Sequence, residues 1–131
     1  MPKATTALRI SPRGTLSSYV SPAVRRGEIY RVRHPQHGDP KKSRCFVVVS
    51  RQELLDSNAN RVLCAAVNTL GVGLATEIGV CVEEGLKHPS VVNCDQLTRL
   101  EKSVLTDYIG MLSSKKLSEL RTALRVALSV D

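Results

Sequence analysis

Tryptophan is absent from this chain of 131 residues and phenylalanine occurs only once, so aromatic residues make up just 3% of the composition. Aliphatic side chains, mainly of valine, leucine and alanine, must therefore fill the interior. Long apolar runs are missing as well, because no stretch approaches the roughly 20 residues of a membrane-spanning helix or looks like a secretory signal. We expect a cytoplasmic protein with one hydrophobic core, since this length is short for two.

Clustered cysteines and histidines are also missing. The four cysteines, at positions 45, 64, 81 and 94, form no CxxC pair, and the three histidines, at 34, 37 and 88, lack the spacing of a zinc site. Each cysteine lies in or beside a valine-rich segment, which predicts buried, reduced thiols. We therefore expect no metal and no cofactor.

The net charge of +7 is unevenly distributed along the chain. Residues 1–25 are rich in Ser, Thr, Pro and Arg without a hydrophobic period, which predicts a flexible basic extension followed by one domain over 26–131. An organellar transit peptide has a similar composition, but three early prolines oppose its amphipathic helix. Because five basic residues and no acid lie in 1–26, the rest carries only +2. Such a domain binds a polyanion only if its basic side chains converge.

Hydrophobic patterning after Gly27 predicts a mainly β fold. Tyr30 and Val32 alternate with arginines, as in a half-exposed strand with a basic outer face. Further strands are expected at 45–49, 62–67, 77–82, 91–95 and 108–112, with a helical turn at 52–55 and a mobile loop at the glycines 71 and 73. Leucines at 117, 120, 124 and 128 follow Ser114, a potential N-cap, at helical spacing. This order indicates an α+β protein, a small barrel-like sheet with helices outside.

Polar residues suited to RNA chemistry lie at three strand ends. Without a metal, the 2′-hydroxyl of RNA must attack its own phosphate, which requires a proton acceptor, a proton donor and a cation. The candidate residues are Arg44, with His37, Lys41 and Lys42 in the loop before it, then Asn68 and Thr69, and finally Asn93, Asp95 and Gln96. In a compact barrel these ends can converge on one rim.

Five segments resemble the MazF/PemK family of toxin endoribonucleases. They are RGEIY at 26–30, SRCFVVVS at 43–50, CAAVNT at 64–69, VVNCDQ at 91–96 and IGML at 109–112. The corresponding family patterns are RGDI, xRPxxVLS, xxPxTS, VxxDQ and xxGxL. Each segment is short, but all occur in the family's order and at similar spacing, so the resemblance covers residues 26–129.

This resemblance implies an SH3-like small barrel of the MazF/PemK/CcdB type with a C-terminal helix, which dimerises and binds RNA in a groove across both subunits. It implies Arg44 as the catalytic arginine and Asp95 as a general base. Asn68 occupies the family's Ser/Thr position, so Thr69 would supply the hydroxyl. Asn93 stands where some members have a proton-donating arginine, and Cys45 replaces the family's proline.

Ordinary structural roles are the alternatives for these residues. A surface arginine often pairs with a carboxylate, but the neighbouring lysines 41 and 42 favour a phosphate site at Arg44. Asp95 could instead cap a turn or pair with Arg99, and Asn68 and Thr69 are common loop-entry residues. His37 could supply the missing acid near neutral pH, or remain a solvated loop residue.

Taken together, the sequence predicts a metal-independent, sequence-selective endoribonuclease for single-stranded RNA, with Arg44, Thr69 and Asp95 as catalytic residues. Residues expected to contact RNA are His37, Lys41, Lys42, Asn68, Asn93 and Gln96. Because aromatics are scarce, recognition should use hydrogen bonds and shape. The resemblance further implies a homodimer and an acidic antitoxin as inhibitor.

Other function classes remain open at this point. A catalytically decayed toxin or a plain nucleic-acid-binding module fits the amides of Asn68 and Asn93. A DNA gyrase poison of the CcdB type shares the fold that the resemblance implies, but that family depends on a tryptophan near the C-terminus, and this chain has none.

Overall fold

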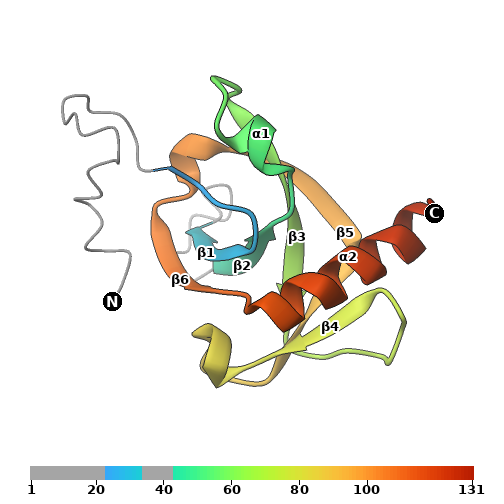
Figure 1. Ribbon diagram of the computed structural model, residues 1–131. Helices are drawn as coiled ribbons and strands as arrows, with labels where there is room; N and C mark the ends of the chain where they lie inside the picture. The colour runs from blue at the N-terminus through green and yellow to red at the C-terminus, as the bar shows by residue number, and fades with distance from the viewer. Residues whose placement is uncertain (1–22, 34–42) are drawn as a thin grey trace.

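The computed structural model describes residues 23–33 and 43–131, which form one six-stranded antiparallel sheet with helices beside it (Figure 1). The strands, in their order across the sheet, are β4 (Glu77–Val80), β5 (Ser90–Glu101), β3 (Arg61–Asn68), β2 (Ser43–Val48), β1 (Glu28–Arg33) and β6 (Asp107–Met111). The helical elements are α1 (Gln52–Leu55), the 3-10 turns η3 (Val82–Glu84) and η4 (Lys102–Val104), and α2 (Ser114–Leu128). This is the mainly β architecture with a C-terminal helix that the sequence predicts.

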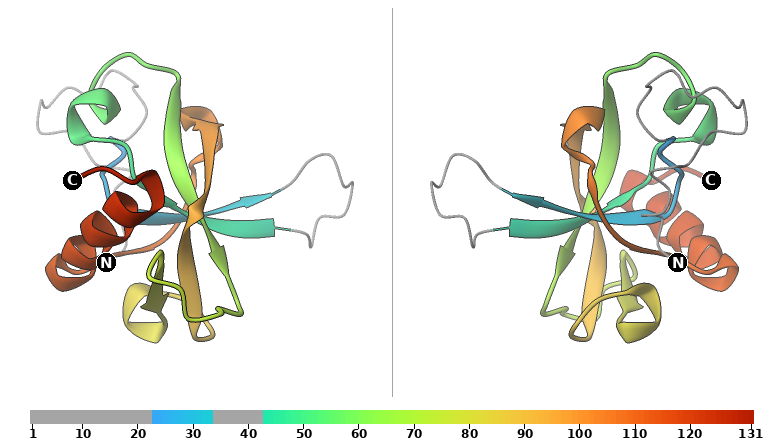
Figure 2. Two further views of the ribbon diagram at one scale, coloured as in Figure 1. Left: turned by 90° about the vertical axis from the view of Figure 1, so that its right-hand side faces the viewer. Right: turned by 90° about the vertical axis from the view of Figure 1, so that its left-hand side faces the viewer.

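The sheet is curled into a half-barrel. In Figure 2 the β1–β2 hairpin crosses the direction of β3 and β5. The register between β3 and β5 shifts where Ala65 pairs with Leu97 but the next residue, Ala66, pairs with Asn93, so β5 bulges in between. Because a bulge bends its strand and increases the local twist, the bulge in β5 helps to close the curl, and it contains Asp95 and Gln96.

Both faces of the central strands are covered. Val47 and Ala65 belong to the larger apolar cluster, to which α2 contributes Leu120 and Ala123. The next residue along β2, Val48, points to the opposite face and joins a second cluster that includes Leu55 of α1. This two-sided burial explains why these strands read as continuous apolar runs rather than as alternating ones.

Three local predictions were wrong in detail. Strand β5 spans 12 residues, well beyond the expected 91–95. Val82 is 69% exposed and begins η3 instead of continuing β4, because the chain turns there. The N-cap of α2 is Ser113, whose side chain accepts a hydrogen bond from the backbone N–H of Lys116 at 3.2 Å, so the helix begins at Ser114 itself.

No helix in the described ranges has the length and apolarity to span a membrane.

The turn after η3 and strand β6 approach each other backbone to backbone. Gly85 has a φ of +98°, and a Cβ on this residue would overlap the carbonyl oxygen of Ile109. A Cβ on Gly110 would overlap the carbonyl oxygen of Glu84 in the same way. Glycine is therefore required on both sides of this contact, which anchors the segment that leads into β5.

We expect Gly110→Ala to lower the free energy of unfolding by about 3 kcal/mol, because the added methyl group must push η3 away from β6. Gly79→Ala is the matched control, since a Cβ there meets no atom within 4 Å. Urea unfolding of both variants measures the difference. Equal midpoints for Gly110→Ala and the wild type would show that the two backbones are not in contact.

Candidate functional site

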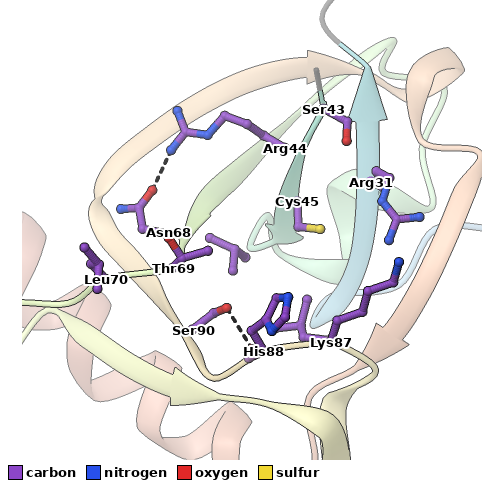
Figure 3. Close-up of a pocket in the computed structure, with 12 residues that line it drawn as sticks. Arg31, Ser43, Arg44, Cys45, Asn68, Thr69, Leu70, Lys87, His88 and Ser90 are labelled. Carbon is purple, nitrogen blue, oxygen red and sulfur yellow. Dashed lines mark hydrogen bonds between the residues drawn. The ribbon is translucent and has the colours of Figure 1, made fainter. Parts of the chain in front are cut away.

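A cleft of about 490 Å³ opens where β1, β2, the end of β3 and the turn before β5 meet (Figure 3). The described residues that line it are Arg31 from β1, Ser43, Arg44 and Cys45 from β2, Val67, Asn68, Thr69 and Leu70 from β3 and beyond, and Leu86, Lys87, His88 and Ser90 before and at the start of β5. This lining contains three permanent cations and, among the described residues, no carboxylate. The cleft is therefore suited to an anionic ligand.

Arg44 is held at the cleft by Asn68. Strands β2 and β3 pair Phe46 with Ala66, and the same register continued by two residues places Arg44 opposite Asn68. The Arg44 guanidinium donates to Asn68 Oδ1 at 2.5 Å, and Asn68 Nδ2 donates to Gln96 Oε1 at 2.8 Å. Because Arg44 forms no ion pair with any described residue, its charge is not neutralised and is available to a phosphate.

Thr69 follows directly on the same wall of the cleft (Figure 3). It is exposed, and its hydroxyl lies at the end of β3, where the polypeptide leaves the sheet. The amide of Asn68 is engaged with Arg44 and Gln96, and the hydroxyl group next to it at this strand end is that of Thr69. The structure thus brings Arg44, Asn68, Thr69 and Gln96 together.

We expect Asn68→Ala to lower kcat/KM for RNA cleavage about 10-fold, because Arg44 loses the acceptor that orients its guanidinium. Asn68→Asp should be slower still, since a carboxylate there would pair with Arg44 and compete with the phosphate. Asn58→Asp makes the same chemical change at an exposed position after α1 and serves as the control. If Asn68→Asp cuts RNA faster than Asn68→Ala, Asn68 does not act through Arg44.

Asp95 and Asn93 lie outside the lining of the cleft. Asp95 Oδ2 accepts a hydrogen bond from Thr76 Oγ1 at 2.7 Å, and the backbone N–H of Asp95 donates to Asn93 Oδ1 at 2.8 Å. The partner of Asp95 is therefore Thr76, not Arg99, the alternative that the sequence suggested. The β5 bulge directs Gln96 toward Asn68 and Asp95 toward Thr76.

Three basic residues of the described cleft lining were not proposed as site residues from the sequence, namely Arg31, Lys87 and His88. Arg31 had been placed only on the basic face of its strand, and in the structure its Nη1 lies 3.4 Å from Asp107 Oδ2. A basic turn directly before a strand was the available signal for Lys87 and His88. The loop residues His37, Lys41 and Lys42 lie outside the described residues, so their expected contacts with RNA stay predictions.

The four cysteines are free, as expected, but only Cys64 and Cys94 are buried, whereas Cys45 and Cys81 are half-buried. Burial raises the pKa of Cys64 to about 12, and burial together with the charge of Asp95 raises that of Cys94 to about 11. Burial also raises the pKa of Cys45 in the cleft, with Arg31 acting in the opposite direction. Because the thiolate is the nucleophile, these three thiols are poorly suited to nucleophilic attack near neutral pH.

One group of potential metal ligands occurs among the described residues, which the spacing argument did not reveal. The Sγ of Cys81 and the carboxylates of Glu83 and Glu84 lie within 4.8 Å of one another. The thiol donates to Glu83 at 2.5 Å, and the Cys81 backbone N–H donates to Glu84 at 2.7 Å. These contacts cap the start of η3, and none of the three residues is part of the described cleft lining.

A curled antiparallel half-barrel with a cleft lined by cationic side chains defines a small β protein whose cleft is suited to an anionic ligand. Residues 25–128 match the family model of the PemK-like, MazF-like toxin of type II toxin-antitoxin systems. Endoribonuclease MazF3 of Mycobacterium tuberculosis is 32% identical over 90 residues, which cover 69% of this chain and 86% of the relative. The chain therefore belongs to the PemK-like, MazF-like toxin family, and its activity class is that of a toxin endoribonuclease.

Solved structures agree with this assignment. The Mycobacterium tuberculosis toxin MazF-mt6 matches with a TM-score of 0.68 and 28% identity, covering 79% of this chain and 98% of that one. A mycobacterial endoribonuclease in complex with its cognate antitoxin matches with a TM-score of 0.67 at 23% identity, covering 83% of this chain and 96% of that one. A chain of the MazE-MazF (Form-II) structure from Deinococcus radiodurans matches with a TM-score of 0.66 at 16% identity, covering 83% of this chain and 98% of that one. The last two likenesses concern the fold alone.

Proposed function

We propose that this toxin endoribonuclease cuts single-stranded RNA without a metal, by attack of the 2′-hydroxyl on the adjacent phosphate. The observation that carries the proposal is Arg44, which is oriented by Asn68, has no carboxylate partner among the described residues and shares its cleft with Thr69. A fixed guanidinium in a cleft whose described lining has no acid can bind a phosphodiester and stabilise the charge that develops on its oxygens.

Each proposed catalytic residue has one role. Arg44 binds the oxygens of the scissile phosphate, and Thr69 donates a hydrogen bond to the substrate beside it. Asp95 accepts the proton of the 2′-hydroxyl, and for this its carboxylate must leave Thr76 Oγ1 and turn toward the cleft. The products are a 2′,3′-cyclic phosphate or 3′-phosphate and a 5′-hydroxyl end.

The remaining predicted site residues are assigned to RNA binding or positioning. Asn93, Gln96, His37, Lys41 and Lys42 would hydrogen-bond bases or backbone phosphates, as the sequence suggested. We assign Asn68 first to holding Arg44, because both ends of its amide are engaged in the cleft. With little aromatic surface available, sequence selectivity would come from these hydrogen bonds and from shape.

We further propose that the chain acts in the cytoplasm as a homodimer and is inhibited by an acidic antitoxin. Complexes of two structural neighbours with their antitoxins support the antitoxin. An acidic segment would compete with RNA for the same cationic cleft. The domain over 26–131 would carry these functions, and residues 1–25 would form a flexible basic extension.

A cleavage assay in excess EDTA tests the proposal directly. Purified protein incubated with a long single-stranded RNA should produce discrete fragments with 5′-hydroxyl ends, whereas a perfectly paired duplex should stay intact. Cleavage that appears only after magnesium is added would rule out the metal-independent route. Binding of RNA without fragments would favour the alternative of a decayed toxin or a nucleic-acid-binding module.

A further inference from the structure

The cleft contains one imidazole, that of His88, among its described residues. The other ionisable groups of the described lining are the guanidinium groups of Arg31 and Arg44, the ammonium group of Lys87 and the thiol of Cys45. Guanidinium and ammonium groups ordinarily hold their protons near neutral pH, and burial raises the pKa of Cys45. Imidazole is the side chain that ordinarily exchanges a proton between pH 5 and 8.

The backbone at His88 is anchored by the fold. Its carbonyl oxygen accepts a hydrogen bond from Ser90 Oγ at 3.0 Å. Leu86 packs into the larger apolar cluster, and the glycine contact with β6 holds the turn just before it. Figure 3 shows the imidazole between Lys87 and Ser90, pointing into the cleft from the side opposite Arg44.

The imidazole ring of His88 is exposed and has no hydrogen-bond or ion-pair partner among the described residues. Charged groups face it from β1, where Arg31 is paired with Asp107 of β6, from β2 through Arg44, and from the adjacent Lys87. Because these neighbours are cationic, the RNA phosphate is the anion that would accompany an imidazolium in the cleft.

We propose that His88 is the general acid of the reaction, an inference that rests on the proposed endoribonuclease function. The 2′-oxygen bonds to phosphorus while its proton passes to the acceptor, for which Asp95 is the candidate. The bond from phosphorus to the 5′-oxygen breaks, and the imidazolium of His88 gives its proton to that oxygen. The neutral imidazole then takes a proton from solvent. The acceptor releases to solvent the proton that it took from the 2′-hydroxyl, so both groups return to their starting states.

A leaving-group substitution tests this role once the cleavage site has been mapped. His88→Asn keeps a polar side chain but cannot protonate the 5′-oxygen, so we expect about 100-fold slower cleavage of ordinary RNA. When the bridging 5′-oxygen at that site is replaced by sulfur, the thiolate leaves without a proton. His88→Asn should then cut within a few-fold of the wild-type rate.

Controls separate this role from other defects. Arg44→Ala should stay slow on both substrates, because its loss affects the phosphate and not the leaving group. Arg125→Gln, at an exposed position of α2 that is not in the described cleft lining, should match the wild type on both.

Distinct outcomes overturn the inference and the function beneath it. If the wild type cuts neither substrate, the proposed function fails and the assignment of His88 fails with it. If the wild type cuts both but His88→Asn is slow on both or normal on both, only the assignment is wrong. It is also wrong if His37→Asn, and not His88→Asn, is restored by the sulfur substrate.

Discussion

Arg44→Ala is expected to lower kcat/KM for cleavage of single-stranded RNA by about 10³-fold. The guanidinium donates planar, charged hydrogen bonds toward a phosphate whose negative charge grows as the 2′-oxygen attacks, and removing such a group from a prepared site typically costs a factor of this size. Circular dichroism and thermal unfolding should stay unchanged, because the Arg44 side chain is exposed and contributes little burial.

Arg44→Lys sharpens this prediction. Lysine keeps the charge but has no planar fork, so we expect it to recover only a small part of the lost rate. Arg99→Ala is the matched control, since Arg99 is an exposed arginine on β5 that is not in the described cleft lining. Initial rates on one defined RNA measure all three variants. A rate for Arg44→Ala within three-fold of the wild type would remove the basis of the proposed function.

Asp95→Asn is expected to slow cleavage by about 10²-fold, the usual contribution of a positioned proton acceptor. Asparagine keeps an oxygen that can accept the hydrogen bond from Thr76, so the local structure should persist while the basic group is lost. Single-turnover rates at saturating protein isolate the chemical step from RNA binding.

Thr76→Val distinguishes catalysis by Asp95 from a structural role of this residue. This variant breaks the hydrogen bond to Asp95 but leaves the carboxylate, so it should slow cleavage far less than Asp95→Asn does. If the two variants are equally slow and both unfold at lower temperature, the carboxylate serves only to join the turn before β4 to β5. If Asp95→Asn cuts at the wild-type rate, another group takes the 2′-hydroxyl proton.

Local pattern was a good guide to the strands, and it selected Arg44, which lines the cleft in the structure. The continuous apolar runs of β2 and β3 predicted strands covered on both faces, and Val47 and Val48 do point into different clusters. Arg44 could be selected because a basic loop, a strand start and a family motif coincide at one residue. The local pattern failed at Val82. The alternation of apolar residues continues to this position, but the chain turns there into η3.

Local sequence patterns could not predict which residues contact Arg44. That Asn68 lies opposite Arg44 follows from the β2–β3 register, and that Gln96 reaches Asn68 while Asp95 reaches Thr76 follows from the bulge in β5. A one-residue change of register would have put other side chains in these places. His88 joins the cleft because the turn before β5 lies beside residues of β1, β2 and β3 that are distant in the sequence.

The sequence by itself determined the class of fold and the family and selected Arg44 as a candidate residue, because periodicity and short motifs are properties of neighbouring residues. The tertiary structure alone decided which polar groups share the cleft with that arginine. Strand register, bulges and the close approach of backbones depend on contacts between residues far apart in the chain, and no local pattern encodes them.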